Sequence, residues 1–318
     1  MAGLWGLGLT TSTPSNRRPE DMNTHPLPPL KDAPDPRYLV IGSALRHARL
    51  QARKSLQEAS DALEPSPGRS RGPVRGRTIS QLSRVETGKC PPWADVVEKL
   101  LHHYAYPPDL ANELIAMAAN WAQSTPNTLH DPAPGWNVRL GIVEGAATHL
   151  RTFASLYVPP AVRTPDYGNA LRDAELTLDG EEERPRARSL RADALTMILE
   201  WSVLERAVGG QAVMAGQLKH LRALTTAGRL RLRILPNRHG VYGPSCAVMT
   251  QMVVHDQCLF VAEGGWAIYM TGPGAGGNCA ARLDALGNAA CSEPESLDLL
   301  DTAITRFERQ AVRAGGAT

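Results

Sequence analysis

The chain has 318 residues, of which 42% are hydrophobic and 5% aromatic, and its formal net charge is +2. This length and composition predict two domains with mostly aliphatic cores. The near-neutral charge excludes a strongly basic nucleic-acid coat, and no apolar run approaches the roughly 18 residues of a membrane-spanning helix. The five cysteines include no CxxC motif, which indicates a reduced, cytoplasmic protein.

The basic residues are concentrated in one segment. Residues 1–36 carry a net charge of −1, residues 37–104 carry +6 and residues 105–318 carry −3. A basic segment ahead of a slightly acidic one indicates a domain that binds a polyanion, followed by a neutral domain. A solvated basic surface without a partner would have the same composition.

The chain divides into five parts by composition. Residues 1–36 are rich in Pro, Ser, Thr and Asn and are expected to be a disordered tail, as are residues 313–318. Residues 37–104 are expected to form a small all-α domain. Residues 105–135 are expected to be a connecting helix and a Pro-rich linker, and residues 136–312 a second domain.

Two capping boxes predict helix starts in the basic segment. Apolar residues at helical spacing predict a first helix around Ile41–Ala48. Ser55-Leu-Gln-Glu58 and Thr78-Ile-Ser-Gln81 each have the pattern in which the first and fourth side chains satisfy the first turn. Gly88 suits the end of the helix that follows Thr78. We expect that helix to bury Ile79, Leu82 and Val85 and to expose Ser80, Gln81, Ser83 and Arg84.

The segments Leu45–Ser60 and Leu82–Pro92 together resemble the phage-repressor-like (XRE/Cro-type) helix-turn-helix family. The resemblance implies binding of double-stranded DNA, normally as a homodimer because one such domain contacts one half-site. It places Ser80, Gln81 and Arg84 on the recognition helix, where Gln can pair with adenine and Arg with guanine or phosphate. By the same resemblance, Ser83, Arg46 and Lys54 contact the DNA backbone.

The chain departs from that family between Leu63 and Thr78. These residues enclose a 14-residue insert, 64–77, where the family has a turn of about three or four residues. One interpretation is that the insert lies along phosphates, because it is basic; the other is that it prevents the two helices from docking on DNA. Its basic residues are Arg69, Arg71, Arg75 and Arg77.

Residues 136–312 predict an α+β domain with a small, mostly antiparallel sheet. Leu230–Leu235 alternates with the period of a half-exposed strand. Ala247–Val254 and Cys258–Ala262 predict a hairpin, and Trp266–Met270 predicts another strand. Helical spacing recurs at Val213–Leu224 and at Leu297–Phe307.

Six phrases of this second domain resemble, in order, the DUF5753 (Scr1-like antitoxin-type) domain that follows the helix-turn-helix in many actinobacterial regulators. The resemblance covers about residues 38–312 and implies a regulator, often paired with a small partner protein. The phrases are Glu144–Leu171, Arg186–Leu195, Val203–Leu221, Leu232–Gly240, Leu259–Gly265 and Ala285–Leu300.

The chain departs from the usual family pattern at two places in this domain. The usual VPGLLQT appears as Val158–Thr164, and a usual acidic pair appears as Glu200-Trp201. If these positions form a polar pocket in the family, this chain binds a different ligand or none. The candidate residues for a ligand or partner pocket are Arg163, Tyr167, Glu200, Trp201 and Glu263.

Signals for an enzyme are weak. Gly272–Gly277 satisfies GxGxxG, but too few residues follow it to complete a βαβ unit, so we expect a loop before a helix and no dinucleotide cofactor. His239, Cys246, His255 and Cys258 match no standard zinc spacing, so we expect no metal. No motif predicts a catalytic residue.

The sequence therefore predicts a DNA-binding transcriptional regulator whose second domain senses a partner protein or a small ligand. One alternative is an antitoxin-like interaction module with little DNA binding. A third hypothesis is an enzyme on a regulator scaffold. The altered residues at Pro159-Pro160 and Trp201 are the observation that supports it.

Overall fold

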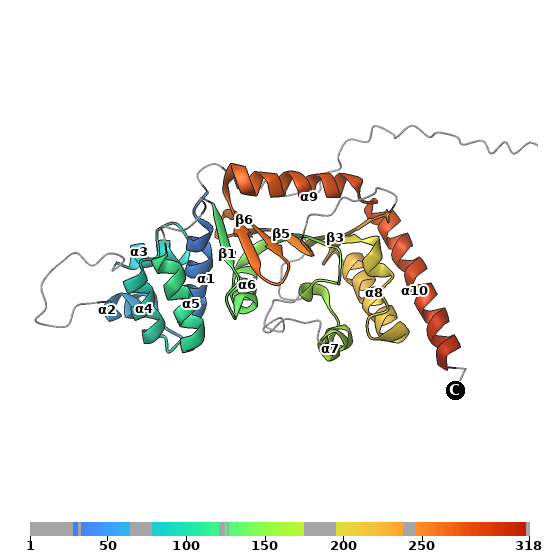
Figure 1. Cartoon of the computed structure of the whole chain (residues 1–318), viewed down its shortest axis with the longest axis horizontal. Helices are drawn as coiled ribbons and strands as arrows, with labels where there is room; N and C mark the ends of the chain where they lie inside the picture. The colour runs from blue at the N-terminus through green and yellow to red at the C-terminus, as the bar shows by residue number, and fades with distance from the viewer. Residues whose placement is uncertain are drawn as a thin grey trace, which may run out of the picture.

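The computed structural model describes residues 28–30, 33–63, 78–120, 125, 127–174, 195–237 and 246–315. The insert 64–77 and most of the predicted tail 1–36 lie outside the described residues. The molecule is elongated, with a helical region at one end and a sheet covered by helices beside it (Figure 1). No helix in the described part of the chain is long and apolar enough to cross a membrane.

The helical region, here called the helix-turn-helix region, spans residues 36–119. Its helices pack around one aliphatic cluster that includes Ile41, Leu45, Leu82 and Leu114. Both predicted capping boxes are present, at Ser55 and at Thr78. The helices are α1 (Pro36–Gln51), α2 (Leu56–Ala62), α3 (Ile79–Glu86), α4 (Ala94–His103) and α5 (Pro108–Ala119).

The predicted burial of α3 is correct at two of three positions. Leu82 and Val85 are each 1% exposed, but Ile79 is 43% exposed. Ile79 is the first residue of the helix, ahead of the turn that packs on the cluster, so the prediction that it points inward is wrong. Gly88 follows α3 with a positive φ of 69°, a conformation that glycine adopts without strain.

Residues 127–315, here called the sheet region, contain a seven-stranded sheet in the order β1-β7-β6-β5-β2-β3-β4. β2, β3 and β4 are parallel to one another, and the other neighbouring pairs are antiparallel. The predicted α+β class is confirmed, but the sheet is larger than expected. The strands are β1 (Thr128–Asp131), β2 (Ala147–Ala154), β3 (Leu195–Glu200), β4 (Arg231–Leu235), β5 (Val248–Val254), β6 (Gln257–Glu263) and β7 (Ala267–Met270).

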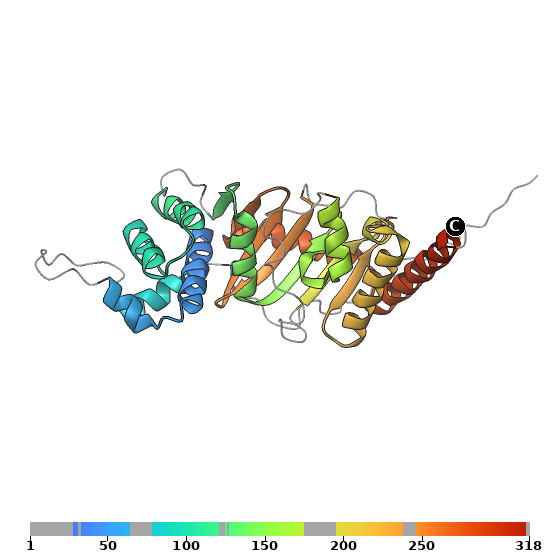
Figure 2. The same ribbon diagram turned by 90° about the horizontal axis from the view of Figure 1, so that it is seen from below.

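Helices cover both faces of the sheet. Figures 1 and 2 show α6 (Trp136–Gly145), α7 (Pro165–Asp173) and α8 (Gly210–Thr226) on one face and α9 (Gly277–Ala289) on the other. The last helix, α10 (Glu293–Gly315), packs against α8 and β4 at the end far from the helix-turn-helix region. Because each face is covered, most strand residues on both faces are buried.

The central strands β2 and β3 are absent from the predicted elements. From Leu150 to Ala154 every residue of β2 is buried, and so are four of the six residues of β3. Strands buried on both faces lose the alternation that identifies a half-exposed strand. The omission of these two strands, and of the short strand β1 in the predicted linker, made the predicted sheet too small.

Helix α1 belongs to both regions. Its Leu39 and Val40 lie in the core cluster of the sheet region, whereas Ile41 and Leu45 lie in the helix-turn-helix cluster. A hydrogen bond also joins the regions: Gln257 Nε2 donates to the Thr87 carbonyl at 2.8 Å. Just ahead of α1, the Pro34 carbonyl accepts a hydrogen bond from Thr271 Oγ1 at 2.7 Å. The two regions therefore share a packed interface.

The stretch 105–135, expected as a connecting helix and a linker, contains α5 and β1. Strand β1 is one of the two edge strands of the sheet and pairs antiparallel with β7. Its Asp131 forms two bonds with Arg139 of α6, at 2.8 and 2.6 Å, and both side chains are fully buried. Within this stretch, α5 packs in the helix-turn-helix cluster, and β1 belongs to the sheet region.

Gly272 and Gly274 of the GxGxxG motif lie in a π-helical turn, Gly272–Gly276, and Gly277 is the first residue of α9. A loop was expected there, so that expectation is wrong. A side chain at Gly276 would meet the ring of Phe260 in β6, and Gly272 has a positive φ of 73°. Close packing and backbone conformation account for both glycines.

Candidate nucleic-acid interface

A buried ion pair fixes the orientation of α3. Arg49 of α1 donates to both carboxylate oxygens of Glu86 at the end of α3, at 2.6 and 2.8 Å. The same guanidinium donates to the Lys54 carbonyl in the turn before α2, at 2.9 Å. The hydrogen bond to Glu86 raises the pKa of Arg49, which keeps the guanidinium protonated. Three backbone segments are thus held in one geometry.

The outward surface of α3 carries most of the predicted recognition residues. Ser80, Gln81 and Arg84 are exposed, while Leu82 and Val85 on the opposite side are buried. Ser83 is only half-buried and lies at the margin of this surface. The predicted recognition residues are therefore together on one helix, with a polar and basic outer face.

The capping box uses part of the Gln81 side chain. Its Oε1 accepts a hydrogen bond from the backbone amide of Thr78 at 3.3 Å, and the backbone amide of Gln81 donates to Thr78 Oγ1 at 3.2 Å. Bidentate pairing with adenine needs both the amide oxygen and the amide nitrogen. Gln81 would have to release the cap to make that contact, whereas Arg84 is free of this constraint because it lies one turn further along.

The residues expected at the DNA backbone lie beside α3. Lys54 Nζ is 3.0 Å from Glu58 Oε1. Hydrogen bonds from Ser55 and Lys54 lower the pKa of Glu58 to about 2. Arg46 is 44% exposed at its side chain and lies 4.0 Å from Glu86. Arg69, Arg71, Arg75 and Arg77 lie outside the described residues.

Sequence reasoning missed a contact beside the recognition helix. The turn between β5 and β6 consists of His255 and Asp256, both with positive φ, as a two-residue hairpin turn requires. Next to it, Gln257 binds the Thr87 carbonyl just after α3. Burial lowers the pKa of His255, and the charges of Arg46 and Lys89 lower it further. The sheet region therefore reaches the end of α3, which no local sequence signal indicates.

The five pocket candidates of the sheet region lie near the same end of the strands. Glu200 ends β3, and Glu263 ends β6. The strand register aligns Leu199, Ala154, Val248 and Glu263 in one row. Three strand spacings separate β3 from β6, or roughly 14 Å. The candidates are therefore spread across the strand ends and do not converge on a single pocket.

Arg163 and Tyr167 are held around the backbone of Val158. Arg163 Nε donates to the Val158 carbonyl at 2.6 Å, and Tyr167 Oη accepts from the Val158 amide at 3.3 Å. Tyr167 is fully buried, and burial raises its pKa. These contacts shape the segment between β2 and α7, which also binds Gln217 of α8.

Trp201 lies in a different setting. Its Nε1 donates to Glu205 Oε1 at 2.8 Å, and the ring borders a hollow of about 430 Å³ beyond the ends of β3 and β4. The hollow also includes Asn237, Glu295 and Asp298. Carboxyl ends of parallel strands are a common place for ligands in α/β sheets. Of the five candidates, Trp201 is the one that lines this hollow.

Family models match two parts of the chain. A helix-turn-helix domain matches residues 40–114, and a domain of unknown function, DUF5753, matches residues 138–302, which is more than half of the chain. The chain belongs to the DUF5753 family. No curated protein and no solved structure matches it. The helix-turn-helix match suggests DNA-binding regulation and a non-enzymatic role.

The DUF5753 match includes α6–α9, β2–β7 and the first half of α10, but it begins after β1.

Within the described part of the chain, no group of three or more His, Cys, Asp or Glu side chains could hold a metal ion. His239 lies outside that part. Burial raises the pKa of Cys246 to about 11 and also raises the pKa values of Cys258 and Cys279. These thiols have the properties of core residues.

Proposed function

We propose that the chain is a transcriptional regulator that binds an operator through the outer surface of α3 and senses a ligand or partner through its DUF5753 region. The observation that carries the proposal is the exposed row Ser80, Gln81 and Arg84 on a helix whose opposite side is buried and whose end is fixed by Arg49 and Glu86. Such a surface suits entry into the major groove.

The shared packing supports transmission of a signal between the regions. Leu39 and Val40 of α1 lie in the sheet-region core, and Gln257 binds the backbone just after α3. A ligand or partner that shifts the sheet region would therefore change the position of the recognition helix. The hollow beside Trp201 is the site that we propose for the effector. Such an effector shifts the DNA-competent population by its differential affinity for the two states.

We also propose that the regulator acts as a dimer. One helix-turn-helix contacts one half-site, and two copies related by a two-fold axis read two half-sites. The surface that joins the copies is considered in the next section.

The experiment that tests the proposed function is binding of the purified full chain to its own upstream DNA and to a scrambled duplex, at several salt concentrations. We expect preference for the upstream DNA, with an affinity that falls steeply with salt. Equal, weak binding to both duplexes that is lost by about 200 mM salt would contradict the operator function.

A substitution then tests the placement of the surface. Arg84→Ala removes the exposed guanidinium from the last turn of α3 and is expected to cost about 1–3 kcal/mol of specific binding if Arg84 reads a base. Arg282→Ala, an exposed arginine on α9, is the matched control and should leave binding unchanged. Unchanged operator affinity in the Arg84 variant would show that α3 is misplaced on the DNA.

A further inference from the structure

Helix α10 exposes a stripe of six residues at heptad spacing. Along this 23-residue helix, the buried side consists of Leu300, Ala303, Ile304 and Phe307, which face α8 and the sheet. The opposite side is exposed, and its residues are spaced alternately by three and four positions. This spacing places the six side chains in one row along the helix, where a second helix would contact them together. The stripe, here called the α10 stripe, is Glu295, Asp298, Thr302, Thr305, Arg309 and Val312.

Charges are ordered along the α10 stripe. Asp298 lies toward its beginning, two threonines form its centre, and Arg309 lies toward its end, with Arg313 beside it. Two helices that run antiparallel about a two-fold axis between positions 303 and 304 would place each Asp298 opposite the Arg309 of the other copy. Thr302 would face Thr305, and Glu295 would face Val312 with Arg313 adjacent. The stripe is therefore complementary to itself.

The charged residues on the flanks of α10 form bonds within the chain, and at the start of the stripe Glu295 accepts hydrogen bonds from the amide and the hydroxyl of Ser292. Asp301 pairs with Arg222 at 2.5 Å, and Glu308 pairs with Lys219 at 2.6 Å. Arg306 donates to the Leu204 carbonyl at 2.7 Å. Among the described residues, no ion-pair partner lies near Asp298 or Arg309. Both charges are exposed, and because Asp298 also borders the hollow beside Trp201, a second molecule bound to the stripe would close one side of that hollow.

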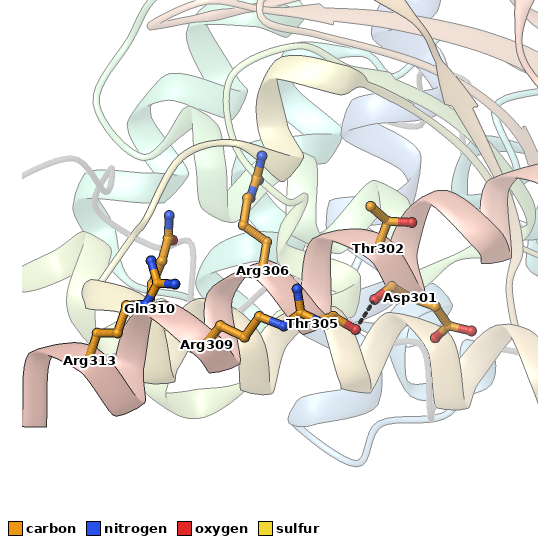
Figure 3. Close-up of a pocket in the computed structure, with 7 residues that line it drawn as sticks. All are labelled: Asp301, Thr302, Thr305, Arg306, Arg309, Gln310 and Arg313. Carbon is orange, nitrogen blue, oxygen red and sulfur yellow. Dashed lines mark hydrogen bonds between the residues drawn. The ribbon is translucent and has the colours of Figure 1, made fainter. Parts of the chain in front are cut away.

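The centre of the stripe can be covered at little cost. Thr302 Oγ1 and Thr305 Oγ1 each donate to a backbone carbonyl one turn earlier, both at 2.9 Å. Because both hydroxyls are already bonded, covering them leaves no unpaired polar group. Their short side chains also let two helices approach closely. A hollow of about 590 Å³ runs along this side of α10, and the described residues that line it all belong to that helix (Figure 3).

We infer that the α10 stripe binds the α10 stripe of a second copy of this chain, antiparallel, and that this contact forms the dimer. The inference deepens the proposed function by naming the surface that joins the copies. α10 lies at the end of the molecule opposite to the helix-turn-helix region (Figure 1), so the contact keeps the two recognition helices apart. The dimer is therefore suited to half-sites separated by more than one helical turn of DNA.

A single helix pair is smaller than the roughly 800 Å² per partner of a standard stable interface. Two pairs of exposed charges add specificity more than affinity and are screened by salt. We therefore expect a dimer whose population rises with protein concentration and falls with ionic strength.

The test is the mass of the full chain by sedimentation velocity without DNA, at about 1–200 µM protein and at low and high salt. Asp298→Arg places like charges opposite each other twice in the dimer and should raise the dissociation constant at least about tenfold. Arg309→Asp should do the same. The double variant D298R/R309D restores both pairs with reversed sign and should recover the dimer.

Arg282→Asp on α9 is the control, because it changes an exposed helical charge outside the stripe and should leave the mass unchanged. Recovery by the double variant also excludes misfolding as the cause of monomers. A monomer at every concentration, or a dimer that resists both single reversals, would overturn the inference. Because DNA is absent, neither result depends on operator binding, so failure of this surface and failure of the proposed function are distinguishable.

Discussion

The helix-turn-helix region and the sheet region each contain a buried arginine–carboxylate ion pair, and the two pairs have different roles. In each pair, a buried arginine makes bidentate hydrogen bonds to a carboxylate: Arg49 with Glu86, and Arg139 with Asp131. In the first region the pair lies directly beneath an exposed surface and sets the orientation of α3. In the second both side chains are 0% exposed, and the pair fastens the edge strand β1 to α6. A buried ion pair can thus position a functional surface or close a fold.

The first prediction concerns the deeper of the two pairs and has the largest effect. Asp131→Ala leaves the Arg139 guanidinium buried without its carboxylate and should destabilise the chain by about 3–5 kcal/mol. Glu86→Ala should cost less, because the Arg49 side chain is 9% exposed and can gain water. Urea unfolding of the two variants measures the difference in the free energy of unfolding.

A double variant separates the loss of the pair from the loss of packing. Arg139→Met with Asp131→Leu removes both charges and keeps apolar volume, so it should be markedly more stable than Asp131→Ala alone. Equal instability of the single and double variants would show that the charges are not what fixes β1. A greater loss in Glu86→Ala than in Asp131→Ala would reverse the comparison of the two regions.

The second prediction uses one substitution in both regions. A methyl group at Gly42 of α1 would clash with the carbonyl oxygen of Val85 in α3, so Gly42→Ala should destabilise the chain by about 1–3 kcal/mol and shift the recognition helix. Gly216 in α8 has no atom within 4 Å of an added Cβ. Gly216→Ala should therefore stabilise its helix by about 0.5–1 kcal/mol.

Thermal unfolding of both glycine variants, together with operator binding, distinguishes the two effects. Gly42→Ala should lose both stability and DNA affinity, whereas Gly216→Ala should keep its affinity. If Gly42→Ala bound the operator as the parent chain does, the close approach of α1 and α3 would not control the recognition surface.

Local patterns in the sequence predicted the helix-turn-helix region well. Capping boxes at Ser55 and Thr78 act within one turn, and the structure contains both. The exposed positions Ser80, Gln81 and Arg84 follow from the period of a single helix. The prediction that Ile79 is buried was wrong because the helical period alone does not show where packing against the rest of the domain begins.

The sheet region was predicted less well because its main features depend on contacts between distant residues. Strand β1 pairs with β7, which is more than 130 positions later in the chain. Arg151 of β2 is buried because it reaches Asp284 and the Leu283 carbonyl on α9, both at 2.6 Å. A charged residue in a central strand has no signal in the local pattern. The joint membership of α1 in two cores is likewise a tertiary property.

The third prediction compares helix caps in the two regions. Thr78 Oγ1 accepts from the Gln81 amide at 3.2 Å at the start of α3, and Thr164 Oγ1 accepts from the Tyr167 amide at 3.3 Å at the start of α7. Either Thr→Ala change should cost about 1 kcal/mol. Only Thr78→Ala should also weaken operator binding, since it loosens the turn that carries Ser80 and Gln81. Hydrogen exchange at these amides measures the loosening, and equal operator affinity in both variants would contradict it.

The smallest expected effect lies at the contact between the regions. Burial, with the charges of Arg46 and Lys89, lowers the pKa of His255 in the folded chain, while Asp256 and Glu86 act in the opposite direction. The unfolded chain, with an ordinary His pKa near about 6.5, then binds the proton more readily than the folded chain. Stability should therefore fall as the pH drops below about 6.5 and rise again with increasing pH.

Replacing the imidazole tests this directly. His255→Gln should reduce the pH dependence of thermal unfolding between about pH 5 and 7, because glutamine does not titrate. His220 of α8 is the matched control in the sheet region, since burial also lowers its pKa but it lies away from the helix-turn-helix region. Hydrogen exchange at Thr87 and Gly88 should respond to acid in the parent chain and in His220→Gln, but not in His255→Gln. An acid response that persists in His255→Gln would mean that another group controls the contact between the sheet region and the end of the recognition helix.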